Sequence, residues 1–235
     1  MSCFNITFFS KALGKSSQML VFKPDDRSPF PVVYQLHGHS DDYTQWARFT
    51  ILEQYAVDNQ IMIVLPDGGR GYYTNAATGD RYEDHILETV EFIDNTFNTI
   101  KDRAQRGIGG LSMGGYGTLK LALKHPDVFS SAAAHSSVIV PEERRGTPFW
   151  DNIFADFKPE DSLRSLALKN GSRINFRFDC GTEDGLLPEN RAFAAFLKEK
   201  EIPHIYEEHP GTHNWDYWRA HVGTAIAFHM KNFGL

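Results

Sequence analysis

A serine between two glycines is the first group in this sequence that could do chemistry. The segment Gly110-Leu111-Ser112-Met113-Gly114 is a G-x-S-x-G motif, typical of a nucleophile elbow in which a strand turns sharply into a helix. Side chains in place of the two glycines would collide as the helix packs back. Residues 106–111 have the apolar character of a strand, and residues 116–123 that of a helix. This context favours a nucleophilic Ser112 over a glycine-rich turn or a phosphate-binding loop.

A serine hydroxyl needs a histidine to take its proton and a carboxylate to orient that histidine. In α/β-hydrolases these two residues follow the serine in the order acid, then histidine. Asp184 directly follows an expected strand, and its neighbour Glu183 is the nearest rival. His213 lies in a glycine-containing loop before the last expected helix, and four other histidines are less well placed: His204, His209, His221 and His229. We therefore expect a triad of Ser112, Asp184 and His213.

Hydrolysis also needs backbone donors aimed at the oxyanion that forms in the reaction. One should be the N–H of Met113, directly after the nucleophile. The loop His37-Gly38-His39 follows an expected strand, where the fold places its second donor. We predict that this donor is the N–H of His39 and that His37 has a structural role.

A metal site is the competing interpretation of the same loop. Residues 37–42, with the letters HGHSDD, come close to the H-x-H-x-D-H pattern of zinc ligands, but the last histidine is missing. No second set of ligands with convincing spacing follows, so metal-dependent hydrolysis is a remote alternative and we expect no metal and no cofactor. Cys3 falls in the N-terminal stretch that alternates as a strand would, and Cys180 falls in an expected strand, which predicts buried free thiols rather than a catalytic cysteine.

Short apolar runs alternate with glycine-bearing loops and amphipathic segments, as in βαβ units around a parallel sheet. We expect strands at residues 4–9, 18–22, 32–36, 61–65, 106–111, 131–135, 174–180 and 204–208. We expect helices at residues 46–59, 82–97, 114–125, 188–200 and 215–232. A short turn near Gly14 joins the first two strands, which should be antiparallel and lie at the sheet edge. The pattern predicts an α/β-hydrolase fold with a mostly parallel sheet of about eight strands and helices on both faces.

The 235 residues suit a single α/β domain over residues 1–235. Residues 136–160 break the rhythm of the elements and carry prolines and aromatic residues, so we expect a short cap over the site. Phe149, Trp150 and Phe154 of this segment are candidates for the substrate pocket, with ordinary packing as the equal alternative. A cap of this modest size favours short acyl esters.

The composition excludes several classes of protein. The formal net charge of −6 is spread along the chain, and no Lys/Arg run offers a footprint for nucleic acid. The longest apolar stretch, residues 61–65, is far shorter than the roughly 20 residues that span a bilayer. The N-terminal residues lack the features of a signal peptide. We expect a cytoplasmic protein with a small-molecule substrate and no nucleic-acid or membrane partner, and a homo-oligomer stays open.

Together these motifs resemble the esterase D family, which includes tributyrin esterases, S-formylglutathione hydrolases, feruloyl and acetyl esterases and mycolyltransferases. The resembling segments are residues 35–38, 65–70, 110–117, 180–184 and 210–218, in order along nearly the whole chain. The resemblance implies the same triad and the same oxyanion donors, His39 and Met113. An apolar residue commonly follows His-Gly in the family, so His39 is a departure that leaves the backbone role intact.

Residues 112–117 look most like those of small bacterial tributyrin esterases, since the S-formylglutathione branch usually has histidine in place of Tyr116. The resemblance thus implies a serine carboxylesterase that hydrolyses short-chain acyl esters through an acyl-enzyme. The same residues would serve an S-formylglutathione-type thioesterase, a feruloyl or sugar-acetyl esterase, or an acyltransferase. Intact triad candidates argue against a binding protein without turnover.

Overall fold

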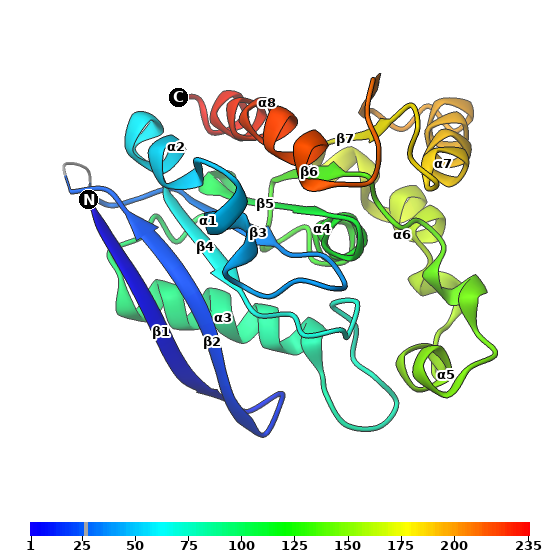
Figure 1. Ribbon diagram of the computed structural model, residues 1–235, viewed down its shortest axis with the longest axis horizontal. Helices are drawn as coiled ribbons and strands as arrows, with labels where there is room; N and C mark the ends of the chain where they lie inside the picture. The colour runs from blue at the N-terminus through cyan, green and yellow to red at the C-terminus, as the bar shows by residue number, and fades with distance from the viewer. Residues whose placement is uncertain (26–27) are drawn as a thin grey trace.

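An eight-stranded sheet forms the centre of the computed structural model, which describes residues 1–25 and 28–235 (Figure 1). The strand order is β1-β2-β4-β3-β5-β6-β7-β8. Strands β3 to β8 are parallel, and β2 pairs antiparallel with both β1 and β4. The strands are β1 (Ser2–Ser10), β2 (Lys15–Lys23), β3 (Val32–Leu36), β4 (Met62–Pro66), β5 (Arg106–Leu111), β6 (Ser131–His135), β7 (Asn175–Gly181) and β8 (Ile205–His209). The predicted fold class is confirmed.

The burial of each strand follows from its place in the sheet. Strands β3, β4, β5 and β6 are buried at every position, as expected for parallel strands covered on both faces. Strand β1 lies at the edge, where most of its residues are exposed or half-buried. The prediction that both cysteines are buried is wrong for Cys3, which is exposed on this edge strand, and right for Cys180 in β7. Both thiols are free.

Helices pack on the two faces of the sheet and bury two apolar clusters. One cluster joins α3, α4, α6 and α7 to the sheet, and the other joins α1, α2 and α8 to the opposite face. Figure 1 shows α1, α2 and α8 on one side of the strands and α3 on the other. The helices are α1 (Gln45–Phe49), α2 (Leu52–Asn59), α3 (Tyr82–Thr96), α4 (Met113–Lys124), α5 (Pro148–Phe154), α6 (Leu163–Asn170), α7 (Leu187–Glu199) and α8 (Trp215–Phe233), with 3-10 turns at Arg103–Gln105, Pro141–Arg144, Pro159–Asp161 and Gly171–Arg173.

Two helical regions differ from the expectation. The helix expected over residues 46–59 is divided into α1 and α2, because Thr50 adopts an extended backbone with φ −135° and ψ 176°. Helix α6 was not expected, although Ser162 caps it by accepting a hydrogen bond from the N–H of Ser165 at 3.2 Å. Within the described residues, no helix combines the length and apolar character needed to cross a bilayer.

The segment expected to form a cap contains the 3-10 turn Pro141–Arg144 and helix α5. Pro148 occupies the first turn of α5, where a missing N–H costs nothing. Figure 1 places α5 at the end of the molecule opposite the two chain termini. Its aromatic residues show no clear helical periodicity in the sequence because they face different surroundings: Phe154 is buried and Phe149 is exposed.

Candidate active site

Ser112, His213 and Asp184 come from three loops at the carboxyl ends of the parallel strands. Ser112 joins β5 to α4, Asp184 follows β7, and His213 lies between β8 and α8. The Nε2 atom of His213 is 2.9 Å from the Ser112 hydroxyl oxygen, and its Nδ1 atom is 2.8 Å from Oδ2 of Asp184. This geometry lets the imidazole take the serine proton while the carboxylate holds its orientation.

The backbone at Ser112 has the strained turn of a nucleophile elbow, with φ 54° and ψ −114°. The neighbouring glycines are required by close approach of the chain. A Cβ at Gly110 would lie 2.5 Å from the carbonyl oxygen of Gly114, and a Cβ at Gly114 would lie 2.5 Å from that of Leu36. The N–H of Ser112 donates to the carbonyl of His135 in β6 at 2.9 Å, which fixes the turn against the sheet.

Asp184 is held as a carboxylate by its hydrogen bonds. Burial alone would raise the pKa of Asp184, but the bond to His213 and the 2.8 Å bond from the N–H of Leu186 outweigh burial and lower the pKa. The rival Glu183 lies on the surface, where it accepts a hydrogen bond from the N–H of Gly211 at 2.6 Å. Glu183 therefore anchors the loop that carries the histidine.

The four rival histidines are engaged elsewhere. His229 is buried, with its Nδ1 atom 2.8 Å from the Ser131 hydroxyl oxygen. His209 and His221 stack on each other, with ring centroids 4.4 Å apart. The Nδ1 atom of His204 is 2.8 Å from the carbonyl oxygen of Ile202. Each of these histidines therefore has a packing or hydrogen-bond partner other than Ser112 and Asp184.

Two backbone N–H groups are available for an oxyanion. The N–H of Met113 lies in the first turn of α4, where donors have no intrahelical acceptor. The N–H of His39 has no acceptor among residues 1–25 and 28–235. His37 holds the loop that carries His39. Its Nδ1 atom is 2.8 Å from the Gly38 carbonyl oxygen, and its Nε2 atom accepts a hydrogen bond from the N–H of Gly68 at 2.8 Å.

The Nε2 atoms of both imidazoles in the HGHSDD segment accept hydrogen bonds from protein donors. Nε2 of His37 accepts from Gly68, and Nε2 of His39 accepts from the guanidinium of Arg70. Among the residues that the structure describes, no group of three or more His, Cys, Asp or Glu side chains is arranged to hold a metal ion.

A cleft of about 400 Å³ opens over the nucleophile. It is lined by Gly38, His39, Ser40, Asp41, Leu111, Ser112, His213, Asn214, Trp215 and Trp218. Sequence analysis missed Asp41, Trp215 and Trp218, although the two tryptophans follow His213 by only two and five positions. The Trp218 ring meets the His213 ring edge-on with centroids 5.0 Å apart, so it braces one side of the imidazole.

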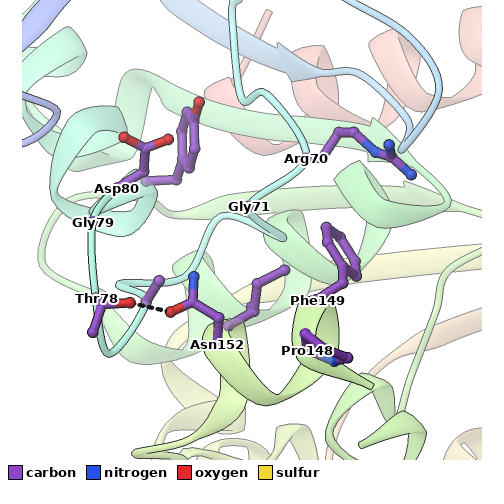
Figure 2. Close-up of a pocket in the computed structure, with 11 residues that line it drawn as sticks. Arg70, Gly71, Thr78, Gly79, Asp80, Pro148, Phe149 and Asn152 are labelled. Carbon is purple, nitrogen blue, oxygen red and sulfur yellow. Dashed lines mark hydrogen bonds between the residues drawn. The ribbon is translucent and has the colours of Figure 1, made fainter. Parts of the chain in front are cut away.

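The three aromatic residues predicted for the pocket have different surroundings. Phe154 has no exposed surface and packs in the apolar core against Tyr116. Trp150 stacks on His39, with ring centroids 6.4 Å apart. Phe149 meets His39 edge-on at 5.3 Å and lines a second pocket of about 380 Å³ (Figure 2). Phe149 and Trp150 thus flank the loop that carries His39, and Phe154 belongs to the core.

Two ionisable groups of the cleft have shifted pKa values. Burial raises the pKa of Asp41, against the opposing effects of His37 and the Gly38 N–H. Burial lowers the pKa of His39, and the nearby guanidinium groups of Arg70 and Arg144 lower it further. The imidazole of His39 is therefore neutral at physiological pH.

The chain is similar to known esterases along nearly its whole length. The Esterase family matches residues 10–229. Acetyl esterase from Caldicellulosiruptor saccharolyticus is 28% identical over 263 residues, covering 98% of this chain and 99% of that protein. S-formylglutathione hydrolase from Staphylococcus aureus has a TM-score of 0.87 at 28% identity, covering 97% of this chain and 98% of that one. A ferulic acid esterase has a TM-score of 0.88 at 26% identity, covering 99% and 98%. The chain therefore belongs to the Esterase family and shares the fold of its α/β-hydrolase members.

Proposed function

We propose that the protein is a serine carboxylesterase in which Ser112, His213 and Asp184 form the catalytic triad. The observation that carries this proposal is the unbroken series of short contacts, 2.9 Å from Ser112 to His213 and 2.8 Å from His213 to Asp184. The strained elbow at Ser112 and membership of the Esterase family support it.

In the proposed reaction, His213 removes the Ser112 proton as the hydroxyl oxygen attacks the ester carbonyl. The N–H groups of His39 and Met113 donate to the oxyanion of the tetrahedral intermediate. His213 then protonates the leaving alcohol, and the acyl group stays on Ser112. Water, deprotonated by His213, attacks this acyl-enzyme, and His213 then returns the proton to the Ser112 oxygen as the acid is released. Side chains and backbone N–H groups of the protein supply every proton transfer and oxyanion contact in this cycle, and we propose no cofactor.

Replacement of the nucleophile tests this mechanism. We expect Ser112→Ala to lower kcat for p-nitrophenyl acetate by roughly 10⁴-fold or more and to abolish labelling by a fluorophosphonate. Ser16→Ala on the exposed face of β2 is the matched control and should keep both properties. EDTA should leave the native rate unchanged. A folded Ser112→Ala protein with native activity would refute the mechanism.

We propose short acyl esters as the substrates, because the cleft over Ser112 has a volume of about 400 Å³. The acetyl esterase among the relatives supports this size range. Thioester hydrolysis and feruloyl ester hydrolysis are the alternatives, supported by the likeness to an S-formylglutathione hydrolase and to a ferulic acid esterase. An acyltransferase or a sugar-acetyl esterase would use the same triad.

A panel of acetyl, butyryl, longer acyl, feruloyl and S-formylglutathione substrates separates these activities by kcat/KM. Addition of an acceptor alcohol, followed by product analysis, distinguishes transfer from hydrolysis. A dominant rate on feruloyl or S-formylglutathione substrates would contradict the short-acyl proposal while leaving the triad in place. A single domain over residues 1–235 and a cytoplasmic location are proposed on the sequence patterns alone.

A further inference from the structure

Arg70 is a charged side chain next to the loop that carries His39. It lies in the loop between β4 and α3, and its Nε and Nη2 atoms are 3.1 and 2.6 Å from Nε2 of His39. The guanidinium also lies over the Phe149 ring, 5.3 Å from its centroid. Figure 2 shows the Arg70 side chain above Phe149, extending away from the pocket wall formed by Gly79 and Asp80. These two contacts fix the guanidinium in place.

The pair of Arg70 and His39 carries one positive charge. Because a guanidinium only donates, Nε2 of His39 must accept, which requires a neutral imidazole. Burial and the neighbouring arginines lower the pKa of His39, in agreement with this protonation state. Arg70 is therefore the cation of this pair, and the imidazole of His39 is neutral.

No carboxylate of the described residues lies within ion-pair distance of Arg70. Arg144, the other arginine near His39, differs because it pairs with Glu189 at 2.9 Å. The edge of Arg70 formed by Nε and Nη2 faces His39, while the edge formed by Nη1 and Nη2 has no hydrogen-bond acceptor among the described residues. A guanidinium edge of this kind matches both oxygens of a carboxylate.

Arg70 lies beside the cleft, in the neighbouring pocket that Phe149 also lines. His39 lines the same cleft as Ser112 and His213, and its N–H is the proposed oxyanion donor. The length of one histidine side chain plus one hydrogen bond places the guanidinium roughly 10 Å or less from that N–H. The net charge of the whole chain is −6, so a general field does not draw anions to this site. Attraction of an anion here depends on Arg70, because the neighbouring Arg144 is paired with Glu189.

We propose that Arg70 is a specificity-determining residue that binds a carboxylate carried by the ester substrate. The protein then prefers esters with one carboxylate over neutral esters of the same size. This inference rests on the proposed esterase function and adds the substrate class to it. The carboxylate can belong to the acyl part or to the alcohol part of the ester, and the experiment separates the two.

The test compares matched charged and neutral esters with the whole protein. One arm uses methyl hydrogen adipate and methyl adipamate, in which the charge is on the acyl part. The other arm uses the acetate esters of 3-hydroxypropanoate and 3-hydroxypropanamide, in which it is on the alcohol part. We expect native protein to show a higher kcat/KM for the charged member in at least one arm. Arg70→Gln should lower the charged-to-neutral ratio there by about tenfold or more, mainly through KM.

Two further variants sharpen the result. Arg70→Lys keeps the charge without the planar edge, so its ratio should lie between those of native protein and Arg70→Gln. Arg191→Gln removes an equal charge from an exposed ion pair with Glu208 and should leave the ratio unchanged. High salt should reduce the native preference.

Three outcomes would overturn the inference. In the first, Arg70→Gln lowers kcat/KM equally for charged and neutral esters, which would mean that Arg70 only positions His39. In the second, native protein has equal kcat/KM for the neutral and the charged ester in both arms, and the esterase proposal still stands. In the third, native protein hydrolyses no ester, and the proposed function fails as well.

Discussion

His135 and Asp179 lie opposite each other at the ends of β6 and β7, with Nδ1 of His135 within 3.0 Å of both carboxylate oxygens. Neither side chain has exposed surface. Asp179 also accepts a hydrogen bond from the Tyr217 hydroxyl at 2.9 Å and pairs with Arg177 at 3.1 Å. The carbonyl of His135 in turn accepts from the N–H of Ser112. This buried network therefore connects the nucleophile loop to the helix that follows His213.

The charge of Asp179 should matter for stability. Burial would raise the pKa of Asp179, but His135, Arg177 and Tyr217 outweigh burial and lower it, so the group is a carboxylate. We expect Asp179→Asn to reduce the free energy of unfolding by about 3 kcal/mol, because it removes the buried carboxylate that His135, Arg177 and Tyr217 share. Tyr217→Phe removes one hydrogen bond and should cost about 1 kcal/mol. Urea denaturation measures both, and equal losses would contradict the central role of the charge.

The carboxylate beside His213 should control catalysis rather than folding. Asp184→Asn keeps the shape of the side chain but turns the oxygen that faces Nδ1 of His213 into an NH2 donor, which favours the wrong imidazole tautomer, so we expect kcat to fall by roughly 10³- to 10⁴-fold. Circular dichroism should show a native fold.

Glu183→Gln is the matched control for that change. Glu183 is adjacent in sequence but bonds to the Gly211 N–H on the surface, so we expect kcat to change by less than about threefold. A larger loss in Glu183→Gln than in Asp184→Asn would reassign the acid.

The packing of the elbow predicts a strong effect at Gly114. A Cβ there would lie 2.5 Å from the carbonyl oxygen of Leu36 and 2.6 Å from that of His37. Backbone must shift to admit it, so Gly114→Ala should cost about 2 kcal/mol or more and lower kcat by displacing the oxyanion loop.

Gly185→Ala is the control, because a Cβ at that position meets nothing within 4 Å. Its free energy of unfolding should stay within about 1 kcal/mol of the native value. Thermal denaturation and p-nitrophenyl acetate hydrolysis measure both variants. Equal stability of the two would contradict the close approach at Gly114.

Acid should destabilise the protein through His229 before its carboxylates titrate. Burial lowers the pKa of His229 to about 3, with smaller contributions from Arg177 and His135. In the unfolded chain, the pKa of a histidine is about 6.5. Between these values the unfolded chain binds one more proton than the folded one, so stability falls as pH falls. The slope for one such group is about 1.4 kcal/mol per pH unit.

The pH dependence can be assigned with a variant. His229→Gln should reduce the slope of the free energy of unfolding between about pH 6 and 4.5 by up to about 1.4 kcal/mol per pH unit. His39, His85 and His221 also have lowered pKa values and should retain part of the slope. Urea denaturation at several pH values measures it. An unchanged slope in His229→Gln would show that His229 does not control the acid sensitivity.

The sequence by itself determined the order and type of most elements. Apolar runs gave the positions of the parallel strands within a few residues, because strands buried on both faces are mostly apolar or small. It also determined the three triad candidates, since each follows a strand and the fold brings the carboxyl ends of parallel strands to one edge. The glycines of the elbow were predictable for the same reason, because they answer a local steric demand.

Only the tertiary structure decided which side chains line the cleft and which partners they have. Arg70 and His39 are 31 residues apart, and His135 and Asp179 are 44 apart, so no local pattern connects either pair. Phe154 enters the core while Phe149 flanks the loop that carries His39, although both belong to α5. The exposure of Cys3 depends on the place of β1 at the edge of the sheet. Such contacts depend on how distant elements are placed, and local sequence constrains that placement only weakly.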